Sequence, residues 1–140
     1  RYFDGLVTVD PHLHRYDSLD AVYWTPSRVV HAAPLLAQWI QNNAYQPLLI
    51  GPDSESEQWV SEVARLAGAP YLVLEKVRRG DRDVSVSVPD VGRWLNHTPV
   101  LVDDIISTAR TMIETVGHVR AAGLLPPICV GVHGIFADRA

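Results

Sequence analysis

The fold is decided by the stretch from Pro99 to Thr111, which reads P-V-L-V-D-D-I-I-S-T-A-R-T. Its apolar run, Val100 to Val102, is typical of a buried parallel strand and ends in two adjacent carboxylates, Asp103 and Asp104. Small and hydroxyl-bearing residues follow, and then a helical pattern, as at a helix start whose backbone N–H groups are free. The stretch therefore predicts a strand, turn and helix that hold a phosphate beside a pair of sugar hydroxyls.

The rest of the chain alternates apolar runs of strand length with segments of helical periodicity. Helices are predicted to begin at Ala32, at Ser54 and after Thr108. Further strands are predicted at residues 5–10, 47–51, 70–75, 83–88 and 127–133. Apolar strands alternating with amphipathic helices favour an α/β fold, in which helices cover both faces of a parallel sheet. We therefore predict a single α/β domain over residues 1–140.

The first two helices have predictable faces and ends. The face expected to be buried in the first helix carries Ala32, Leu35, Leu36, Trp39 and Ile40. In the second helix it carries Val60, Val63, Ala64 and Ala67. Ser54 and Glu57 form a capping-box signature at the start of that helix, and Gly68 is a natural stop.

Composition excludes several classes of protein. Twelve basic against 16 acidic side chains give a net charge of −4, which argues against a nucleic-acid-binding surface. No apolar run approaches the roughly 20 residues that cross a bilayer, so no membrane partner is expected. The single cysteine, Cys129, fits a reducing compartment, and a cytoplasmic protein is predicted.

Polar residues gather where the predicted strands end: Asp10 and His12, Asp53, Glu75 and Lys76, Asp103 and Asp104, and His133. Ligands of open parallel sheets bind beyond the carboxyl ends of the strands. The sequence therefore places a binding site at that edge. Two carboxylates before a phosphate-cradling turn would repel a polyphosphate unless they address hydroxyls or a cation, so a sugar phosphate is the natural ligand there.

The segment from Asp10 to His14 reads D-P-H-L-H and leaves three interpretations open. An Asp-x-His-x-His after a strand also begins many metal-dependent amidohydrolases, but their barrel needs about 250 residues. The two histidines could simply lie in a surface turn. Alternatively, His12 helps to hold a divalent ion with Asp10 nearby, through an ion-bound water if the ion is Mg²⁺.

Two other signals are weak by themselves. Basic side chains cluster at Lys76, Arg78, Arg79 and Arg82, in a segment without periodicity that we predict to be a loop over about residues 76–83. Such a loop is either solvated or a mobile clamp for an anion. Asp53, which follows Gly51 and Pro52, could merely support its turn.

The segment V-L-V-D-D-I-I-S-T-A-R-T resembles the ribose-phosphate signature of type I phosphoribosyltransferases and of phosphoribosyl pyrophosphate synthetases. Four other segments resemble the synthetases (ribose-phosphate pyrophosphokinases), in the expected order: V-T-V-D-P-H-L-H-R-Y-D-S-L, G-P-D-S-E-S-E-Q-W, L-E-K-V-R-R-G-D-R-D-V-S-V and V-G-V-H-G-I-F-A-D-R-A. The resemblance implies a type I phosphoribosyltransferase-like domain that corresponds to the second half of a two-domain synthetase.

The same resemblance implies an enzyme, a ribose-phosphate diphosphokinase. It would transfer pyrophosphate from ATP to O1 of ribose 5-phosphate, with Mg²⁺, and give phosphoribosyl pyrophosphate and AMP. A homo-oligomer is expected. Two alternatives remain: a phosphoribosyltransferase that uses phosphoribosyl pyrophosphate, and a non-catalytic homologue that associates with active synthetase subunits.

The resemblance also assigns roles to residues. Lys76 matches the catalytic lysine of a flexible loop and Arg78 its companion arginine, while His12 and Asp53 match metal-site residues with Asp10 as an auxiliary. The predicted ribose 5-phosphate site consists of Arg78, Asp103, Asp104, Ser107, Thr108, Ala109, Arg110 and Thr111. Arg110 departs from the family pattern, because that position is usually small.

Overall fold

The computed structural model describes residues 3–13, 16, 18–79, 83–87 and 91–137. These residues form two compact units, Arg1–Ala32 and Ala33–Ala140. The predicted sheet lies in the second unit, whereas the first 32 residues cluster by themselves. Among the described residues, no helix has the length and apolar character needed to cross a membrane.

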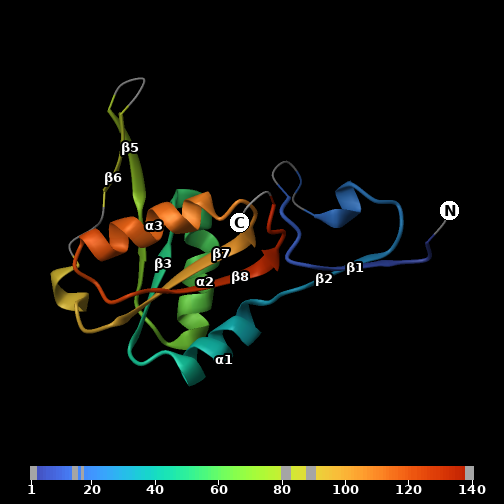
Figure 1. Ribbon diagram of the computed structural model, residues 1–140. Coiled ribbons are helices and arrows are strands. Elements are labelled where there is room, and N and C mark those ends of the chain that lie inside the picture. Colours follow the sequence, from blue (N-terminus) through green and yellow to red (C-terminus); the bar gives the residue numbers. More distant parts are fainter. Residues whose placement is uncertain (1–2, 14–15, 17, 80–82, 88–90, 138–140) are drawn as a thin grey trace. The chain divides into compact units, whose positions relative to one another are not determined.

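A four-stranded sheet forms the centre of the larger unit, in the order β4-β3-β7-β8 (Figure 1). Its strands are β3 (Pro47–Gly51), β4 (Tyr71–Val73), β7 (Thr98–Ile106) and β8 (Ile128–Gly134). All three pairings between them are parallel. The carboxyl ends of these four strands therefore lie at one edge of the sheet, as the sequence predicts, but the strand predicted at residues 5–10 belongs to a separate two-stranded sheet.

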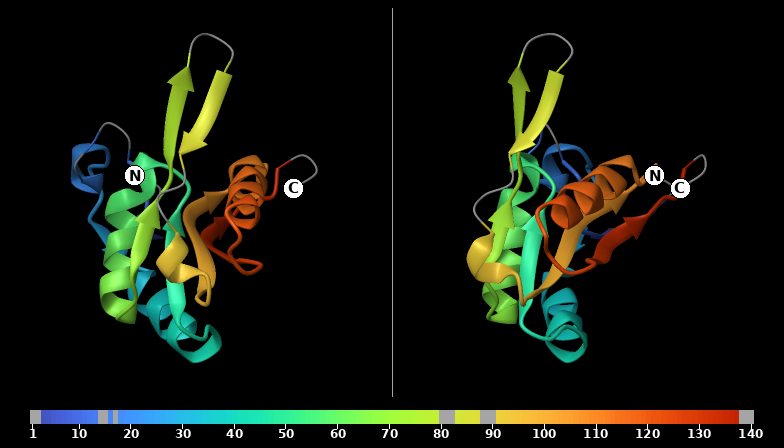
Figure 2. Two further views of the ribbon diagram at one scale, coloured as in Figure 1. Left: turned by 90° about the vertical axis from the view of Figure 1, so that its left-hand side faces the viewer. Right: turned by 60° about the vertical axis from the view of Figure 1, so that its left-hand side comes forward.

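Helices cover both faces of this sheet. Helices α1 (Ala33–Asn43) and α2 (Glu57–Ala67) pack with Leu49, Val100 and Val102 in one core cluster. Helix α3 (Arg110–Ala121) packs on the other face, where Leu48 and Leu101 belong to a second cluster. Neighbouring residues of β3 and β7 thus alternate between the two helical layers, which Figure 2 shows on opposite sides of the sheet. The predicted α/β fold class is confirmed.

Helix α2 has the predicted buried face and a different N-terminal cap. All four of its predicted core residues are buried, and Gly68 ends it in the left-handed region with φ 65°. The predicted capping box of Ser54 and Glu57 is wrong. Asp53 is the cap instead: it accepts from the backbone N–H groups of Glu55 and Ser56, at the start of a 3-10 turn, Ser54–Ser56, that precedes the helix.

The predicted buried face of α1 is right in part, because Ile40 is buried and Leu36 packs against the first core cluster. The side chains of Leu35 and Trp39 are 71% and 44% exposed, whereas Ala33, Ala37 and Ile40 are buried. Alanines from both α1 and α2 belong to the first core cluster. Small side chains let two helices approach closely, so the alanines of α1 turn inward, and of its larger apolar side chains Leu35 and Trp39 turn out.

Strand β7 is longer than the apolar run that predicts it. It continues through Asp103 and Asp104, because β8 pairs with it as far as Ile106 and Gly134. The two carboxylates therefore lie within the strand, and the turn begins only at Ser107.

The segment predicted as a loop over about 76–83 begins as a strand. Strand β5 (Glu75–Arg79) pairs antiparallel with β6 (Asp83–Ser87), which matches the strand predicted at 83–88. Residues 80–82 and 88–90 lie outside the described part of the chain. In this hairpin the basic residues of β5 lie opposite the alternating sequence of β6.

The smaller unit contains strand β1 (Leu6–Val9), which was predicted, and strand β2 (Ser27–Val30), which was not. The two strands are parallel, and Val9 is the partner of Val30. A 3-10 turn, Leu19–Ala21, lies between them in the sequence, and another, Gly92–Trp94, precedes β7 in the larger unit.

Candidate functional site

The turn between β7 and α3 leaves the first backbone N–H groups of the helix without a side-chain cap. Ala109 is the N-cap of α3 and has a left-handed backbone with φ 58°. An alanine has no side-chain oxygen, so no side chain of its own satisfies the first N–H groups of the helix. Those groups and the positive end of the helix dipole favour an anion at this point.

A small hollow lies at this helix start. It is lined by the end of β7, by every residue from Ser107 to Thr111 and by Met112, and its volume is about 80 Å³. Pockets for drug-sized ligands run from roughly 300 to 1,000 Å³. The hollow therefore suits a single phosphate group rather than a whole nucleotide.

Asp103 lines the same hollow, and the pKa of its carboxyl is raised. Burial raises the pKa of its carboxyl to about 6, and the charges of Asp104 and Asp53 contribute to the rise. The backbone N–H of Asp104 donates to Asp103 Oδ1 at 3.0 Å and partly offsets it. The charges of Asp53 and Asp104 thus act on the Asp103 carboxyl at the edge where ligands of such sheets bind.

This raised pKa gives a pH prediction. The folded protein keeps a proton on Asp103 that the unfolded chain releases near pH 4, so stability falls as pH rises from there through about 6. Asp103→Asn removes the ionisation. We expect a higher Tm than wild type at pH 7–8, and little difference below pH 4. Thermal unfolding followed by circular dichroism across pH gives the difference curve, and a curve that stays flat would contradict the assignment.

The predicted residues of the β5–β6 hairpin are placed only by their backbone. Lys76 and Arg78 lie in β5, in register with Val86 and Val84. Their side chains lie outside the described part of the structure, so the predicted roles in catalysis and ribose 5-phosphate binding stay predictions.

In the smaller unit, Asp10 ties the ends of two strands together. Its Oδ1 lies 2.9 Å from Nδ1 of His31, and its Oδ2 accepts from the backbone N–H of Ala32 at 2.7 Å. Asp10 directly follows β1 and His31 directly follows β2, so the Val9–Val30 pairing brings them side by side. The sequence offered no sign of this pair, because β2 was not predicted.

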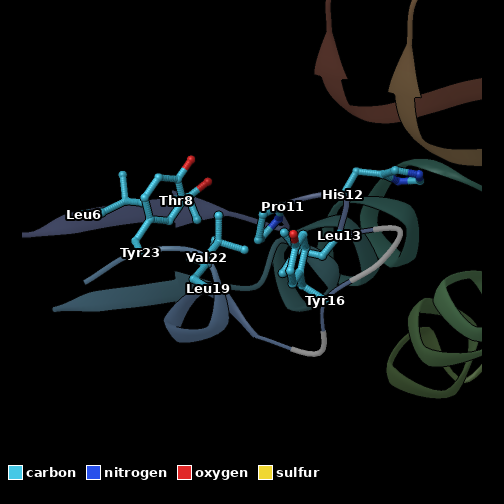
Figure 3. Close-up of a pocket in the computed structure, with 9 residues that line it drawn as sticks. All are labelled: Leu6, Thr8, Pro11, His12, Leu13, Tyr16, Leu19, Val22 and Tyr23. Carbon is cyan, nitrogen blue, oxygen red and sulfur yellow. The ribbon is translucent and has the colours of Figure 1, made fainter. Parts of the chain in front are cut away.

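The predicted metal residues lie in different units, His12 in the smaller and Asp53 in the larger. His12 is exposed, and its imidazole points away from an apolar pocket of about 550 Å³ whose edge it shares with Tyr16 and Tyr23 (Figure 3). Within the described ranges, no group of three or more His, Cys, Asp or Glu side chains could hold a metal ion.

Comparison with known proteins decides the family. Residues 18–140 match the family described as "Phosphoribosyl transferase domain". The chain belongs to this family. The crystal structure of phosphoribosylpyrophosphate synthetase from Mycobacterium smegmatis superposes with a TM-score of 0.77 at 27% identity, covering 96% of this chain and 43% of that one.

Curated relatives extend the resemblance over the whole chain. Ribose-phosphate pyrophosphokinase from Methanopyrus kandleri is 34% identical over 141 residues, which are 98% of this chain and 46% of the relative. The enzyme of that name from Pyrococcus abyssi is 29% identical over 144 residues, 99% of this chain and 47% of the relative. The resemblance read from the five segments is confirmed, and the chain spans about half the length of these relatives.

The fold alone is shared more widely. Adenine phosphoribosyltransferase from Thermoanaerobacter pseudethanolicus has a TM-score of 0.62 at 14% identity, covering 74% of this chain and 66% of that one. The predicted type I phosphoribosyltransferase-like fold is thereby confirmed.

Proposed function

We propose that this chain is part of a ribose-phosphate diphosphokinase, which transfers pyrophosphate from ATP to O1 of ribose 5-phosphate. The observation that carries the proposal is the end of β7, where two carboxylates precede an uncapped helix start around a phosphate-sized hollow. The synthetases named among the relatives support it over nearly the full chain. We also propose that the protein is cytoplasmic and that it forms a homo-oligomer. Light scattering of the purified protein would test the oligomeric state.

Ribose 5-phosphate fits this site with its two ends distinguished by charge. Its phosphate would accept hydrogen bonds from the start of α3 and from the hydroxyls of Ser107, Thr108 and Thr111, with Ala109 contributing its backbone. Arg110, which also lines the hollow, would add a positive charge. Asp103 and Asp104 would accept hydrogen bonds from the vicinal ribose hydroxyls. The carboxylate pair would repel any anion at the phosphate site. Ribose 5-phosphate would offset this repulsion by donating hydrogen bonds from its hydroxyls, which an anion without hydroxyls could not do.

The reaction requires charge neutralisation rather than covalent chemistry by the protein. The O1 hydroxyl of ribose 5-phosphate attacks the β-phosphorus of ATP, the bond from that phosphorus to the α,β-bridging oxygen breaks, and AMP leaves while the hydroxyl proton goes to solvent. Lys76 and Arg78 would stabilise the negative charge that builds on the transferred group and the leaving oxygen.

Asp10 and Asp53 offer the carboxylate oxygens that Mg²⁺ prefers, so we propose a Mg²⁺ ion that the nucleotide would help to hold. Mg²⁺ is usually held by one or two carboxylates together with substrate phosphates and water, so a complete protein cage is not needed. We propose that His12 and Asp53 contact the ion or its waters. Asp10 would help by fixing the strand end that precedes His12, since His31 and Ala32 engage its oxygens. When bound, the ion neutralises phosphate oxygens of ATP.

The test is to supply the full-length protein with ATP, Mg²⁺ and ribose 5-phosphate and to measure AMP by chromatography. AMP formation that depends on ribose 5-phosphate is the expected result, and its absence would contradict the proposal. The phosphoribosyltransferase alternative draws on the shared fold, and it predicts pyrophosphate release from phosphoribosyl pyrophosphate on addition of a nucleobase. A non-catalytic homologue would instead form AMP only with an added active subunit.

A further inference from the structure

The residue that precedes the phosphate turn, Ile106, is seated on a glycine of the neighbouring strand. A Cβ on Gly131 would lie 2.8 and 2.9 Å from Cδ1 and Cγ1 of Ile106, distances that real Cβ atoms essentially never show. Ile106 also packs against the second core cluster, to which Met112 of α3 belongs. The missing side chain at Gly131 therefore sets where the end of β7 lies.

The segment after β8 also holds the end of β7, through backbone hydrogen bonds. The carbonyl of Ile106 accepts from the N–H groups of Ile135 and Phe136 at 3.0 and 3.2 Å, and the carbonyl of Ser107 accepts from Ala137 at 3.1 Å. In a planar trans peptide the C=O and the following N–H point in opposite directions. Fixing these two carbonyls therefore turns the N–H groups of Ser107 and Thr108 away from the β8 segment.

Phe136 holds this segment in an unfavourable backbone conformation. Its φ is 49°, a region that is unfavourable for a bulky residue and that tends to occur at functional sites. Its ring lies where a Cβ on Gly134 would be, with Cε2 and Cζ directly against that position. The ring is nevertheless 64% exposed, so burial in the core does not explain why it is held there.

We propose that Gly131 and Phe136 are positioning residues for the phosphate turn, which orient its N–H groups toward the 5-phosphate without touching the substrate. This inference rests on the proposed function. Packing on Gly131 fixes the side chain of Ile106, and the backbone of residues 135–137 fixes the first two peptide planes of the turn. Loosening either contact is expected to weaken sugar-phosphate binding selectively, because the rest of the sheet keeps its core.

The experiment compares matched substitutions in the full-length protein. Gly131→Ala and Phe136→Ala are expected to raise the Kd for ribose 5-phosphate, measured by calorimetry, roughly tenfold, since small misplacements of binding groups have such effects. The KM for ribose 5-phosphate should rise in parallel, with the KM for ATP unchanged. Phe136→Tyr keeps the ring and should restore wild-type values.

Two controls separate this role from a general structural one. Gly117→Ala makes the same chemical change in α3, where a Cβ would meet nothing within 4 Å. Ile135→Ala removes the neighbouring side chain, which is 63% exposed. Both should leave the Kd for ribose 5-phosphate within about twofold of wild type, well below the shifts that misplaced binding groups cause.

Unchanged binding in Phe136→Ala, or equal rises in both KM values, would overturn the inference while leaving the proposed function intact if wild type still makes AMP. A wild-type protein that binds no ribose 5-phosphate would overturn both. Should Gly131→Ala fail to fold, Phe136→Ala alone decides, because its ring lies mostly in solvent.

Discussion

Replacing Lys76 with alanine is expected to lower kcat for AMP formation roughly 10²–10³-fold, the usual cost of removing one group that stabilises charge in a transition state. The affinity for ribose 5-phosphate should stay near the wild-type value, because the proposed phosphate contacts come from the start of α3 and not from Lys76. Steady-state AMP assays and calorimetry on the full-length protein measure the two quantities.

Arg79→Ala is the matched control for Lys76→Ala. It removes one positive charge from the same strand, β5, three residues away, at the position that pairs with Asp83. If proximity to a basic strand were enough, both variants would lose activity to the same degree. Equal losses, or full activity in Lys76→Ala, would rule out the specific role of Lys76.

The phosphate turn was predictable because its signals are local. An apolar run, two carboxylates and a helix start succeed one another within the 13 residues from Pro99 to Thr111, and each has a direct physical meaning. The extent of β7 was not predictable in this way. Pairing with β8 decides where the strand ends, and a partner strand more than 20 residues later leaves no mark on the sequence of β7 itself.

The Asp10–His31 pair shows the same limit more clearly. Both residues are polar and follow short strands, yet only the parallel pairing of β1 with β2 brings them together. Asp53 was ambiguous for another reason. Its sequence context allowed a metal role or a turn, and the structure adds a definite capping bond to two backbone N–H groups without testing the metal.

Helix α1 shows how a sequence pattern can identify a buried face only in part. Leu35, Leu36, Trp39 and Ile40 have helical spacing, and hydrophobicity alone favours burying all of them. Ile40 and Leu36 do pack in the core, but packing against α2 selects alanines in place of Leu35 and Trp39. The outcome depends on how near two helices approach, a quantity that neither helix encodes alone.

Two leucine substitutions measure this difference directly. Leu101, fully buried in β7 among the second core cluster, should lose about 2–5 kcal/mol of unfolding free energy on replacement by alanine, through lost burial and the cavity left behind. Leu35→Ala deletes the same atoms from a side chain that is 71% exposed and should change stability by no more than about 0.5 kcal/mol.

Urea unfolding followed by circular dichroism gives both values. A loss in Leu35→Ala comparable with that in Leu101→Ala would mean that the outer face of α1 is packed after all, as the periodicity alone predicts. The expected contrast would show instead that the stability of the larger unit depends on β7. The same strand carries Asp103 and Asp104 and leads into the phosphate turn. Burial of Leu101 therefore stabilises the strand on which the proposed site is built.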